Sequence, residues 1–244
     1  MAVTIGDRVA EAKTKSLSPA ARQQGYAKSD ETRSAILDAA LASFGAHGFA
    51  GATTRGIAAE AGVTLPSIAY HFGGKQGLYI ACAEDIVARY ERSAVALASA
   101  GEISFDPIGD PERCRAELKR VLHMVLRIFA ETESAQSRAD FVAREMRERG
   151  PAFTILYERL WQPGVNMAAR LLAGAKNKHN VTESDRTEAL MLISSLLAFN
   201  SGRDVSLQIL GRDALDTATF ALIESTIDHF VDALTRGDDP TSSE

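Results

Sequence analysis

Apolar residues recur at steps of three and four along most of the chain, which is the period of helices. The first such run begins at Ser29–Asp30, where either side chain can cap a helix, and it ends at His47–Gly48. Its apolar positions are Ile36, Leu37, Ala40, Leu41 and Phe44. Residues 1–29 show no such period, and we expect them to form a flexible arm.

Short helices and tight turns are predicted next. One helix starts at Thr53–Thr54 and ends at Ala61, because Gly62 can adopt the left-handed conformation that follows a last helical turn. After a second short helix, Gly73–Gly74 breaks the chain. A long helix is then predicted from Lys75 to about Ala100.

The second half of the chain reads as helices as well. After a loop over 101–109, the predicted segments are a helix opened by Asp110-Pro111-Glu112, a helix over 137–149, a stretch over 152–175 interrupted at Pro163–Gly164, a helix from Thr182 to Leu210–Gly211, and a helix from Asp216 to Arg236. The last helix carries an apolar stripe at steps of 3, 4, 3 and 4: Phe220, Ile223, Ile227, Phe230 and Leu234. Since no strand-length alternation occurs, the predicted fold class is all-α.

Charge is distributed unevenly. The net charge is −5 over 244 residues, which by itself argues against a nucleic-acid partner. Residues 1–80 nevertheless carry eight Lys/Arg against six Asp/Glu, a balance of +2, so the remainder holds −7. The basic arm over 1–29 is either a plain leader or a contact for phosphate.

Cysteine usage and hydropathy indicate the cytoplasm. Cys82 and Cys114 lie in helical surroundings and have neither disulfide nor zinc spacing, so we expect two buried thiols. The N-terminus lacks the apolar segment of a signal peptide, and no apolar run approaches the roughly 18–20 residues of a membrane span.

The segment from Thr53 to Lys75 has the physics of a helix-turn-helix. Small side chains at Ala58 and Ala61 let two helices approach closely, and Gly62 makes the turn. Thr64 then caps a helix over Leu65–Phe72, in whose first turn Pro66 needs no N–H. This helix is about 12 Å long, which matches the width of a DNA major groove.

These residues resemble the TetR family of regulators. Its pattern reads T-T-x-x-I-A-x-x-A-G-V-(S/T), then a short helix ending in Y-x-H-F or Y-x-Y-F, then a lysine and a leucine. The matching residues are Thr53, Thr54, Ile57, Ala58, Ala61, Gly62, Val63, Thr64, Tyr70, His71, Phe72, Lys75 and Leu78. The chain departs from the pattern in its Tyr-His-Phe spacing, which places His71 directly before Phe72.

The resemblance implies a DNA-binding set. Thr54 and Arg55 would lie near the DNA backbone or groove edge, and Lys75 would hold a phosphate at a helix N-terminus. The residues implied to face the groove or its phosphates are Thr64, Leu65, Pro66, Ser67, Tyr70 and His71. For Tyr70 the alternative is plain packing, and for His71 it is an ordinary surface residue. No Lys or Arg occurs in residues 64–72, so base reading would depend on hydroxyl and apolar contacts.

The C-terminal part is similar to the CecR-like branch of that family. The similarity rests on Phe141, Arg144, Glu145, Pro151, Phe153, Tyr157, Pro163, Arg203 and Leu210–Gly211. Candidate effector contacts are His123, Arg144, Glu145, Tyr157, Trp161 and Phe199. For Arg144 and Glu145 the alternative is a structural ion pair or cap, and for the aromatic residues it is core packing.

Three classes of function were weighed. The first is a TetR-like transcriptional regulator, foremost a repressor released from its operator by a small molecule. The second is a helical enzyme that acts on a lipophilic or aromatic small molecule, but no nucleotide-binding or hydrolase motif occurs. The third is an architectural DNA-binding protein without an effector. No cofactor is expected, and the scattered histidines predict no metal site.

The resemblance also implies the organisation of the protein. We expect a basic arm over 1–29, a DNA-binding domain over 30–76, an effector and dimerisation domain over 77–237 and a tail over 238–244. The last two long helices would pair with their copies in a homodimer, because a 3-4 stripe is the seam of packed helices. A two-fold dimer would read an inverted-repeat operator.

Overall fold

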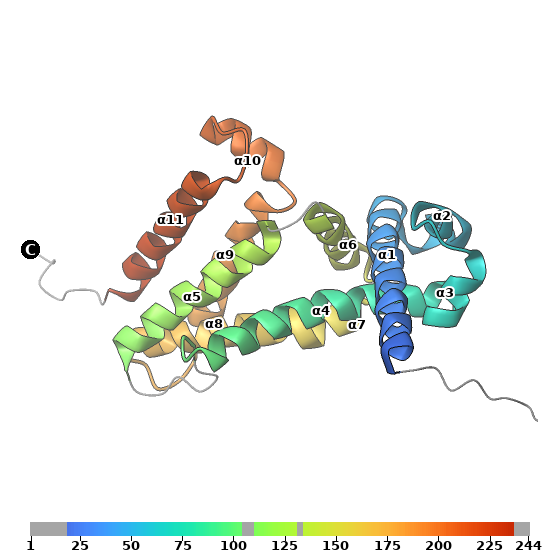
Figure 1. Cartoon of the computed structure of the whole chain (residues 1–244). Helices are drawn as coiled ribbons and strands as arrows, with labels where there is room; N and C mark the ends of the chain where they lie inside the picture. Colours follow the sequence, from blue (N-terminus) through green and yellow to red (C-terminus); the bar gives the residue numbers. More distant parts are fainter. Residues whose placement is uncertain (1–18, 104–109, 131–133, 237–244) are drawn as a thin grey trace, which may run out of the picture.

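The computed structural model describes residues 19–103, 110–130 and 134–236, and these residues form helices and no strands, as the sequence predicts. The elements are α1 (Pro19–Gly51), α2 (Thr54–Glu60), α3 (Leu65–Phe72), α4 (Lys75–Ser99), α5 (Pro111–Ala130), α6 (Ser134–Glu148), α7 (Phe153–Leu156), the π-helix η1 (Tyr157–Trp161), α8 (Gln162–Ala175), α9 (Glu183–Ser195), the 3-10 helix η2 (Leu196–Phe199), α10 (Arg203–Leu210) and α11 (Thr217–Thr235) (Figure 1). The predicted tail over 238–244 and residues 1–18 of the predicted arm lie outside the described residues.

Helix α1 starts earlier than predicted. It begins at Pro19, so residues 19–29 are helical rather than part of a flexible arm, and Ser29 and Asp30 lie inside the helix. The sequence there is rich in Ala, Arg, Gln and Lys, which favour helix without any apolar period. Gly48, with φ of 69°, interrupts the helical geometry at the predicted stop.

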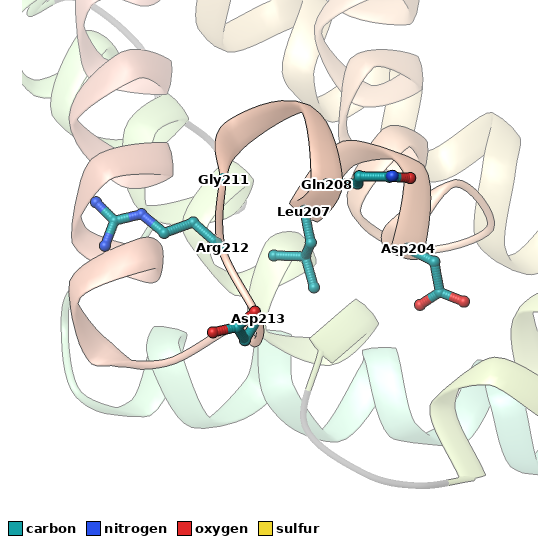
Figure 2. Close-up of a pocket in the computed structure, with 6 residues that line it drawn as sticks. All are labelled: Asp204, Leu207, Gln208, Gly211, Arg212 and Asp213. Carbon is teal, nitrogen blue, oxygen red and sulfur yellow. The ribbon is translucent and has the colours of Figure 1, made fainter.

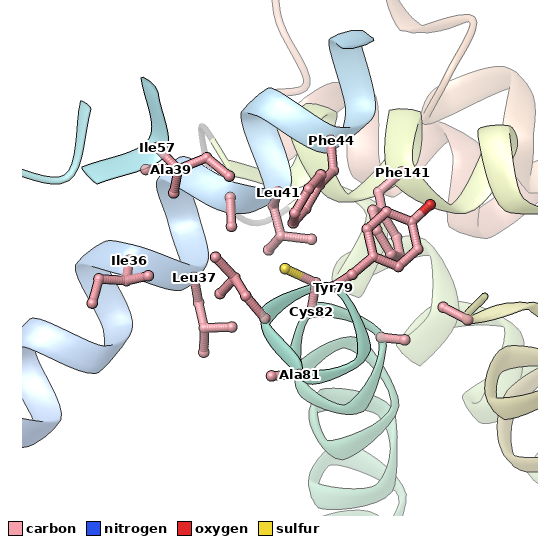
Figure 3. Packing of buried hydrophobic residues seen from close by; sticks show 14 of the residues in the cluster. Ile36, Leu37, Ala39, Leu41, Phe44, Ile57, Tyr79, Ala81, Cys82 and Phe141 are labelled. Atoms are coloured by element: carbon pink, nitrogen blue, oxygen red, sulfur yellow. The ribbon is translucent and has the colours of Figure 1, made fainter. Parts of the chain in front are cut away.

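The first of two hydrophobic cores joins α1, α2 and α3 to the first half of α4 and to α6 and α7. Phe44, Tyr79 and Phe141 are its largest buried side chains, and Tyr79 contacts both phenylalanine rings edge-on or tilted (Figure 3). Helix α6 packs along α1. The predicted domain boundary between residues 76 and 77 therefore falls inside this core.

The second core is built from α5, α8, α9, η2 and α11. Its fully buried side chains include Leu118, Leu122, Leu126 and Leu172. Helix α11 packs mainly on α5, and α10 mainly on η2, so both lie at the edge of the molecule (Figure 1). Cys82 lies in the first core and Cys114 in the second, and both are buried free thiols, as predicted.

The start of α9 shows how local signals position an element of this core. Thr182 and Asp185 form a capping box, in which Asp185 accepts from the Thr182 N–H at 2.9 Å and Thr182 Oγ1 accepts from the Asp185 N–H at 3.3 Å. Burial alone would raise the pKa of Asp185, but hydrogen bonds from Lys178 and Thr182 hold that pKa well below its usual range. The cap and the lysine together fix the loop before α9.

Two predicted elements are corrected. The stretch over 152–175 is not interrupted at Pro163–Gly164, because the π-helix η1 precedes the proline and lets the helix continue into α8. The helix predicted from Thr182 to Leu210–Gly211 ends at Ser195, and the chain passes through η2 and Asn200 before α10 begins. Asn200, with φ of −111° and ψ of −89°, departs from helical geometry.

The predicted stripe of α11 is split between two faces. Ile223 and Ile227 are buried in the second core together with Val231, whereas Phe230 is 51% exposed and Leu234 is 37% exposed. The inner face repeats every four residues and belongs to the chain's own core. The apolar residues that α11 leaves uncovered are Leu222, Phe230 and Leu234.

Candidate nucleic-acid interface

The turn between α2 and α3 is set by local hydrogen bonds. Thr53 Oγ1 accepts from the Gly56 N–H at 3.1 Å and caps α2, and Gly62 has φ of 64°. The carbonyl oxygen of Thr64 accepts from the Ser67 N–H at 3.0 Å. The Thr64 hydroxyl makes no cap bond and instead lies 3.0 Å from the Ser67 hydroxyl. These bonds set where α3 begins and tie two of its candidate contact residues together.

Helix α3 has one buried side and one exposed side. Ile68 is buried against Ile57 and Ala58 of α2, which fixes α3 in place. Tyr70 is 83% exposed and Leu65 is 44% exposed. The remaining predicted contact residues of this helix are exposed or half-buried: Thr64, Pro66, Ser67 and His71. The structure thus leaves all six accessible, and Tyr70 stacks edge-on against His71 at 5.0 Å between ring centroids.

Cations flank α3 rather than lie on it. Arg55 is exposed in the first turn of α2, next to the half-buried Thr54. The Lys75 ammonium lies 3.5 Å from the carbonyl oxygen of Ala50 and 4.8 Å from the centroid of the Phe49 ring. It is therefore partly engaged within the chain at the start of α4.

Sequence reasoning missed Arg33, an exposed residue of α1. Its guanidinium lies 5.2 Å from the ring centroid of Phe72, the last residue of α3. The two residues are far apart in the sequence, so no spacing could have indicated this proximity. Arg33, Arg55 and Lys75 lie on α1, α2 and α4, next to a helix that presents hydroxyl, aromatic and aliphatic groups. This arrangement suits phosphate contacts at the edges and groove contacts in the middle.

Arg144 and Glu145 of α6 hold the first core together. Arg144 donates to the carbonyl oxygens of Gly45 at 3.1 Å and Ala46 at 3.0 Å, near the end of α1. Buried Glu145 accepts from the Tyr79 hydroxyl of α4, and its second oxygen accepts from the Ala152 N–H at 3.1 Å. Burial and the Glu145 carboxylate raise the pKa of Tyr79, so its phenol remains a donor. These contacts match the structural role that was the alternative to effector binding for Arg144 and Glu145.

Two family matches cover most of the chain. Residues 36–82 match the family described as bacterial regulatory proteins, tetR family. Residues 114–237, just over half of the chain, match the C-terminal domain of the HTH-type transcriptional dual regulator CecR. The chain belongs to the TetR family, in its CecR-like branch.

Individual relatives agree. The chain is 28% identical over 215 residues to the HTH-type transcriptional dual regulator CecR of Shigella flexneri, which covers 86% of this chain and 94% of that protein. It is 34% identical over 137 residues to the HTH-type transcriptional regulatory protein RaaS of Mycobacterium tuberculosis, over 56% of this chain and 53% of that protein. As a TetR-family member, the protein is a DNA-binding transcriptional regulator and not an enzyme.

Solved structures show the same fold. A TetR-like transcriptional regulator from Rhodococcus sp. RHA1 aligns with a TM-score of 0.53 at 21% identity, over 90% of this chain and 94% of that one. An HlyIIR mutant protein aligns with a TM-score of 0.54 at 17% identity, over 84% of this chain and 98% of that one. Among the described helices of this TetR-family protein, none is long and apolar enough to cross a bilayer.

The remaining candidate effector residues of this regulator do not converge on one site. His123 Nε2 lies 2.9 Å from Asp228 Oδ1, in a row of polar pairs between α5 and α11. Tyr157 and Trp161 pack against Phe153 along the α7–η1 helix, with ring centroids 5.9 and 5.6 Å from it. Phe199 packs at the edge of the second core.

Surface hollows of the TetR-family chain lie elsewhere. One is found at the end of α10, where Leu207 points inward and polar groups surround it (Figure 2): its lining is Asp204, Leu207, Gln208, Gly211, Arg212 and Asp213. Another lies at the α5–α11 seam beside Arg115 and Lys119. Neither is lined by a predicted effector residue. In the described part of the chain no group of His, Cys, Asp and Glu has the arrangement of a metal site.

Proposed function

We propose that this TetR-family regulator is a homodimeric repressor that binds an inverted-repeat operator through α3 and leaves it when a small-molecule effector binds the C-terminal part. One observation carries the DNA-binding part of this proposal: an α3 fixed by Ile68 presents Tyr70 and Leu65 to solvent, where a monomer gains nothing from their exposure. A regulator that acts on DNA works beside it, so we place the protein in the cytoplasm.

Residues at the interface divide into three groups. Thr64, Ser67 and Leu65 would contact base edges, since hydroxyls bond to bases and an aliphatic group packs on a thymine methyl. Tyr70 and His71 would contact phosphates or thymine methyls, and Pro66 would pack against the groove. Arg55, Lys75, Thr54 and the newly recognised Arg33 would contact the backbone, which positions the protein without specifying sequence.

The dimer surface lies on α9, α10 and α11. Exposed large apolar side chains gather there: Leu190, Met191, Val205, Ile209, Leu210, Leu222, Phe230 and Leu234. Exposed large apolar side chains in such number are typical of a protein interface. A second copy related by a two-fold axis would cover it, and its α3 would read the second half-site, about 34–36 Å away.

The effector part comprises residues 77–237 in this proposal, with the DNA-binding part over 30–76. His123, Tyr157, Trp161 and Phe199 remain candidate contacts for the effector. Release requires that the effector bind more tightly to a conformation in which the spacing of the two α3 helices differs. The relative from Shigella flexneri is named a dual regulator, so activation at other promoters is compatible with the same mechanism.

Selection from random double-stranded DNA tests the proposal. The purified full chain should enrich an inverted repeat, with half-sites spaced by one helical turn or somewhat more. Tyr70→Ala should weaken binding to the enriched sequence, whereas Glu60→Ala, an exposed change on α2, should not. Enrichment of a single non-repeated site, or of no sequence, would reject the dimeric operator reader.

A further inference from the structure

Two continuous helical stretches cross from the first core to the second. On α4 the fully buried residues end at Val87; Tyr90 packs against the first core, whereas Leu97 and Ala98 pack against the second. On the α7–η1–α8 helix, Leu156 is buried in the first core and Ala168 in the second (Figure 1). Residues 88–99 and 157–167 contain no fully buried residue, so the side chains at this crossing are less buried than those of either core.

On the α7–η1–α8 helix, the transition from the first core to the second occurs where helix propensity is lowest. Leu160 and Trp161 pack against the first core, and Val165 packs against the second. Pro163 and Gly164 lie between them. Proline lacks an N–H and its ring would clash with the carbonyl four residues earlier, and glycine has poor helix propensity.

A π-turn accommodates the proline. The Gln162 N–H donates to the carbonyl oxygen of Tyr157, five residues earlier, which widens the helix directly before Pro163. Such turns bend helices and often occur at functional sites. A Cβ built on Gly164 would meet no atom within 4 Å, so packing does not demand the glycine at this position.

The π-helix η1 packs against α4 and is also joined to it by an exposed ion pair. Arg159 pairs with Glu91 of α4 at 2.9 Å, but both side chains are about half exposed. An exposed pair of this kind contributes little and is screened by salt. Helix α4, by contrast, has neither proline nor π-turn between its ends. A bend in the α7–η1–α8 helix, with α4 unchanged, alters the angle between the two bodies, which α5 and α6 also join through their mutual contact.

We propose that the η1 π-turn with Pro163–Gly164 is a hinge on which the second core tilts relative to the first. The hinge deepens the proposed function, on which its role in operator release rests: a tilt moves α3 relative to the dimer surface. The hinge motion itself depends on neither DNA nor effector, so it can be measured alone.

The test restores an ordinary helix at the hinge. Pro163→Ala with Gly164→Ala supplies the missing N–H and raises helix propensity, and Gly164→Ala alone is the milder variant. Asn166→Ala is the matched control, because it changes an exposed residue of α8 beyond the hinge. Hydrogen exchange of the amides over Tyr157–Trp161 should slow in the double variant by roughly fivefold or more, which corresponds to ~1 kcal/mol.

Spin labels measure the tilt. Glu60→Cys on α2 and Arg186→Cys on α9 place one exposed label on each body, in a chain diluted with unlabelled protein. The chain without the two added cysteines serves as the control, because any label that it takes up is bound to the buried Cys82 or Cys114. Double electron–electron resonance should show a broad distance distribution that narrows in the double variant, less in Gly164→Ala, and not in Asn166→Ala.

Three outcomes would contradict the hinge. Unchanged exchange means that the proline does not hold the π-turn open. Slower exchange with an unchanged distance distribution means that the turn does not govern the tilt. Narrowing by Asn166→Ala means that the π-turn has no special part in it. A narrowed distribution in a chain that enriches no operator would leave the hinge standing and reject the proposed function.

Discussion

Among the described side chains of α1, α2 and α3, large apolar groups are well exposed at Leu65 and Tyr70, both on α3. In α9, α10 and α11 there are eight such groups, spread over all three helices. The region of α1, α2 and α3 completes its core within one chain. Its exposed large apolar side chains are only those suited to a DNA groove. The second region, that of α9, α10 and α11, cannot cover its apolar surface with the residues it has.

The contrast indicates which partner each region needs. The cations Arg33, Arg55 and Lys75 lie on α1, α2 and α4, the helices next to α3, as expected beside phosphates. Phe230 and Ile209 are among the exposed large apolar side chains of the second region, as expected of contact with another protein. We therefore propose that the exposed residues contact DNA in one region and a second copy in the other, and five substitutions test this difference.

The largest effect is expected at Ile227, on the inner face of α11. Ile227→Glu places a carboxylate in the apolar second core, which should cost about 4 kcal/mol or more. Thermal unfolding by circular dichroism should show a chain that is largely unfolded at ambient temperature. A folded monomer would instead mean that Ile227 belongs to the dimer surface.

Glu145 tests how firmly the first core is closed. Glu145→Ala leaves the Tyr79 hydroxyl and the Ala152 N–H without their acceptor, at a cost of about 2–4 kcal/mol. Glu148→Ala removes a half-exposed partner of Arg144 and should cost less than about 1 kcal/mol. Urea unfolding measures both. Equal losses would contradict the structural role of the buried carboxylate.

The two regions also differ in what the sequence could predict. The bounds of α3 follow from adjacent residues, since Gly62, Pro66 and Gly73 each act within a few positions of themselves. The starts of α5 at Asp110 and of α9 at Thr182 are local in the same way. Elements specified by caps and turns are therefore predicted well.

The features that the sequence did not predict depend on residues far apart in the chain or on unusual helical geometry. A helical period cannot anticipate the π-turn at Tyr157–Trp161, and the non-amphipathic start of α1 offers no period at all. The partners of Arg144 lie near the end of α1, 98 and 99 residues earlier, so sequence could suggest its importance but not its role. Sequence likewise could not decide which side of α11 faces its own core.

Phe230, on the outer face of α11, tests the proposed dimer surface. Phe230→Glu adds a charge to a side chain that is 51% exposed in the chain, so the fold should persist. A charge on each copy at the proposed dimer surface, with the loss of an apolar anchor, should weaken the dimer by about 2–4 kcal/mol. Sedimentation should show monomer at concentrations where the unsubstituted chain is dimeric. An intact dimer would remove Phe230 from the interface.

Tyr70 tests the exposed face of α3. Tyr70→Ala should reduce operator affinity by about 1–3 kcal/mol, the scale of one good contact. Stability should hardly change, because the side chain is 83% exposed. Fluorescence anisotropy with the selected operator measures the first and thermal melting the second. A strong fall in melting temperature with unchanged binding would assign Tyr70 to packing.

The smallest effect is expected at Lys75, where contacts within the chain compete with a contact to DNA phosphate. Its ammonium lies near the Ala50 carbonyl oxygen and the Phe49 ring, so part of its role is within the chain. A phosphate contact at the start of α4 would nevertheless release a counterion on binding. Lys75→Ala should then lower the log–log salt slope by about one unit per half-site and weaken all DNA sequences alike.

Arg120→Ala provides the matched comparison, because Arg120 is a cation on α5 in the second core region and donates to the Glu102 carbonyl oxygen at 2.6 Å. Removing it changes the net charge of the protein by the same amount but should leave the slope unchanged, since it does not face DNA. If both variants lower the slope equally, the effect is one of overall charge, and Lys75 serves α4 rather than the operator. If Lys75→Ala alone lowers the slope and the base preference is retained, the lysine positions the regulator on its operator while α3 reads the sequence.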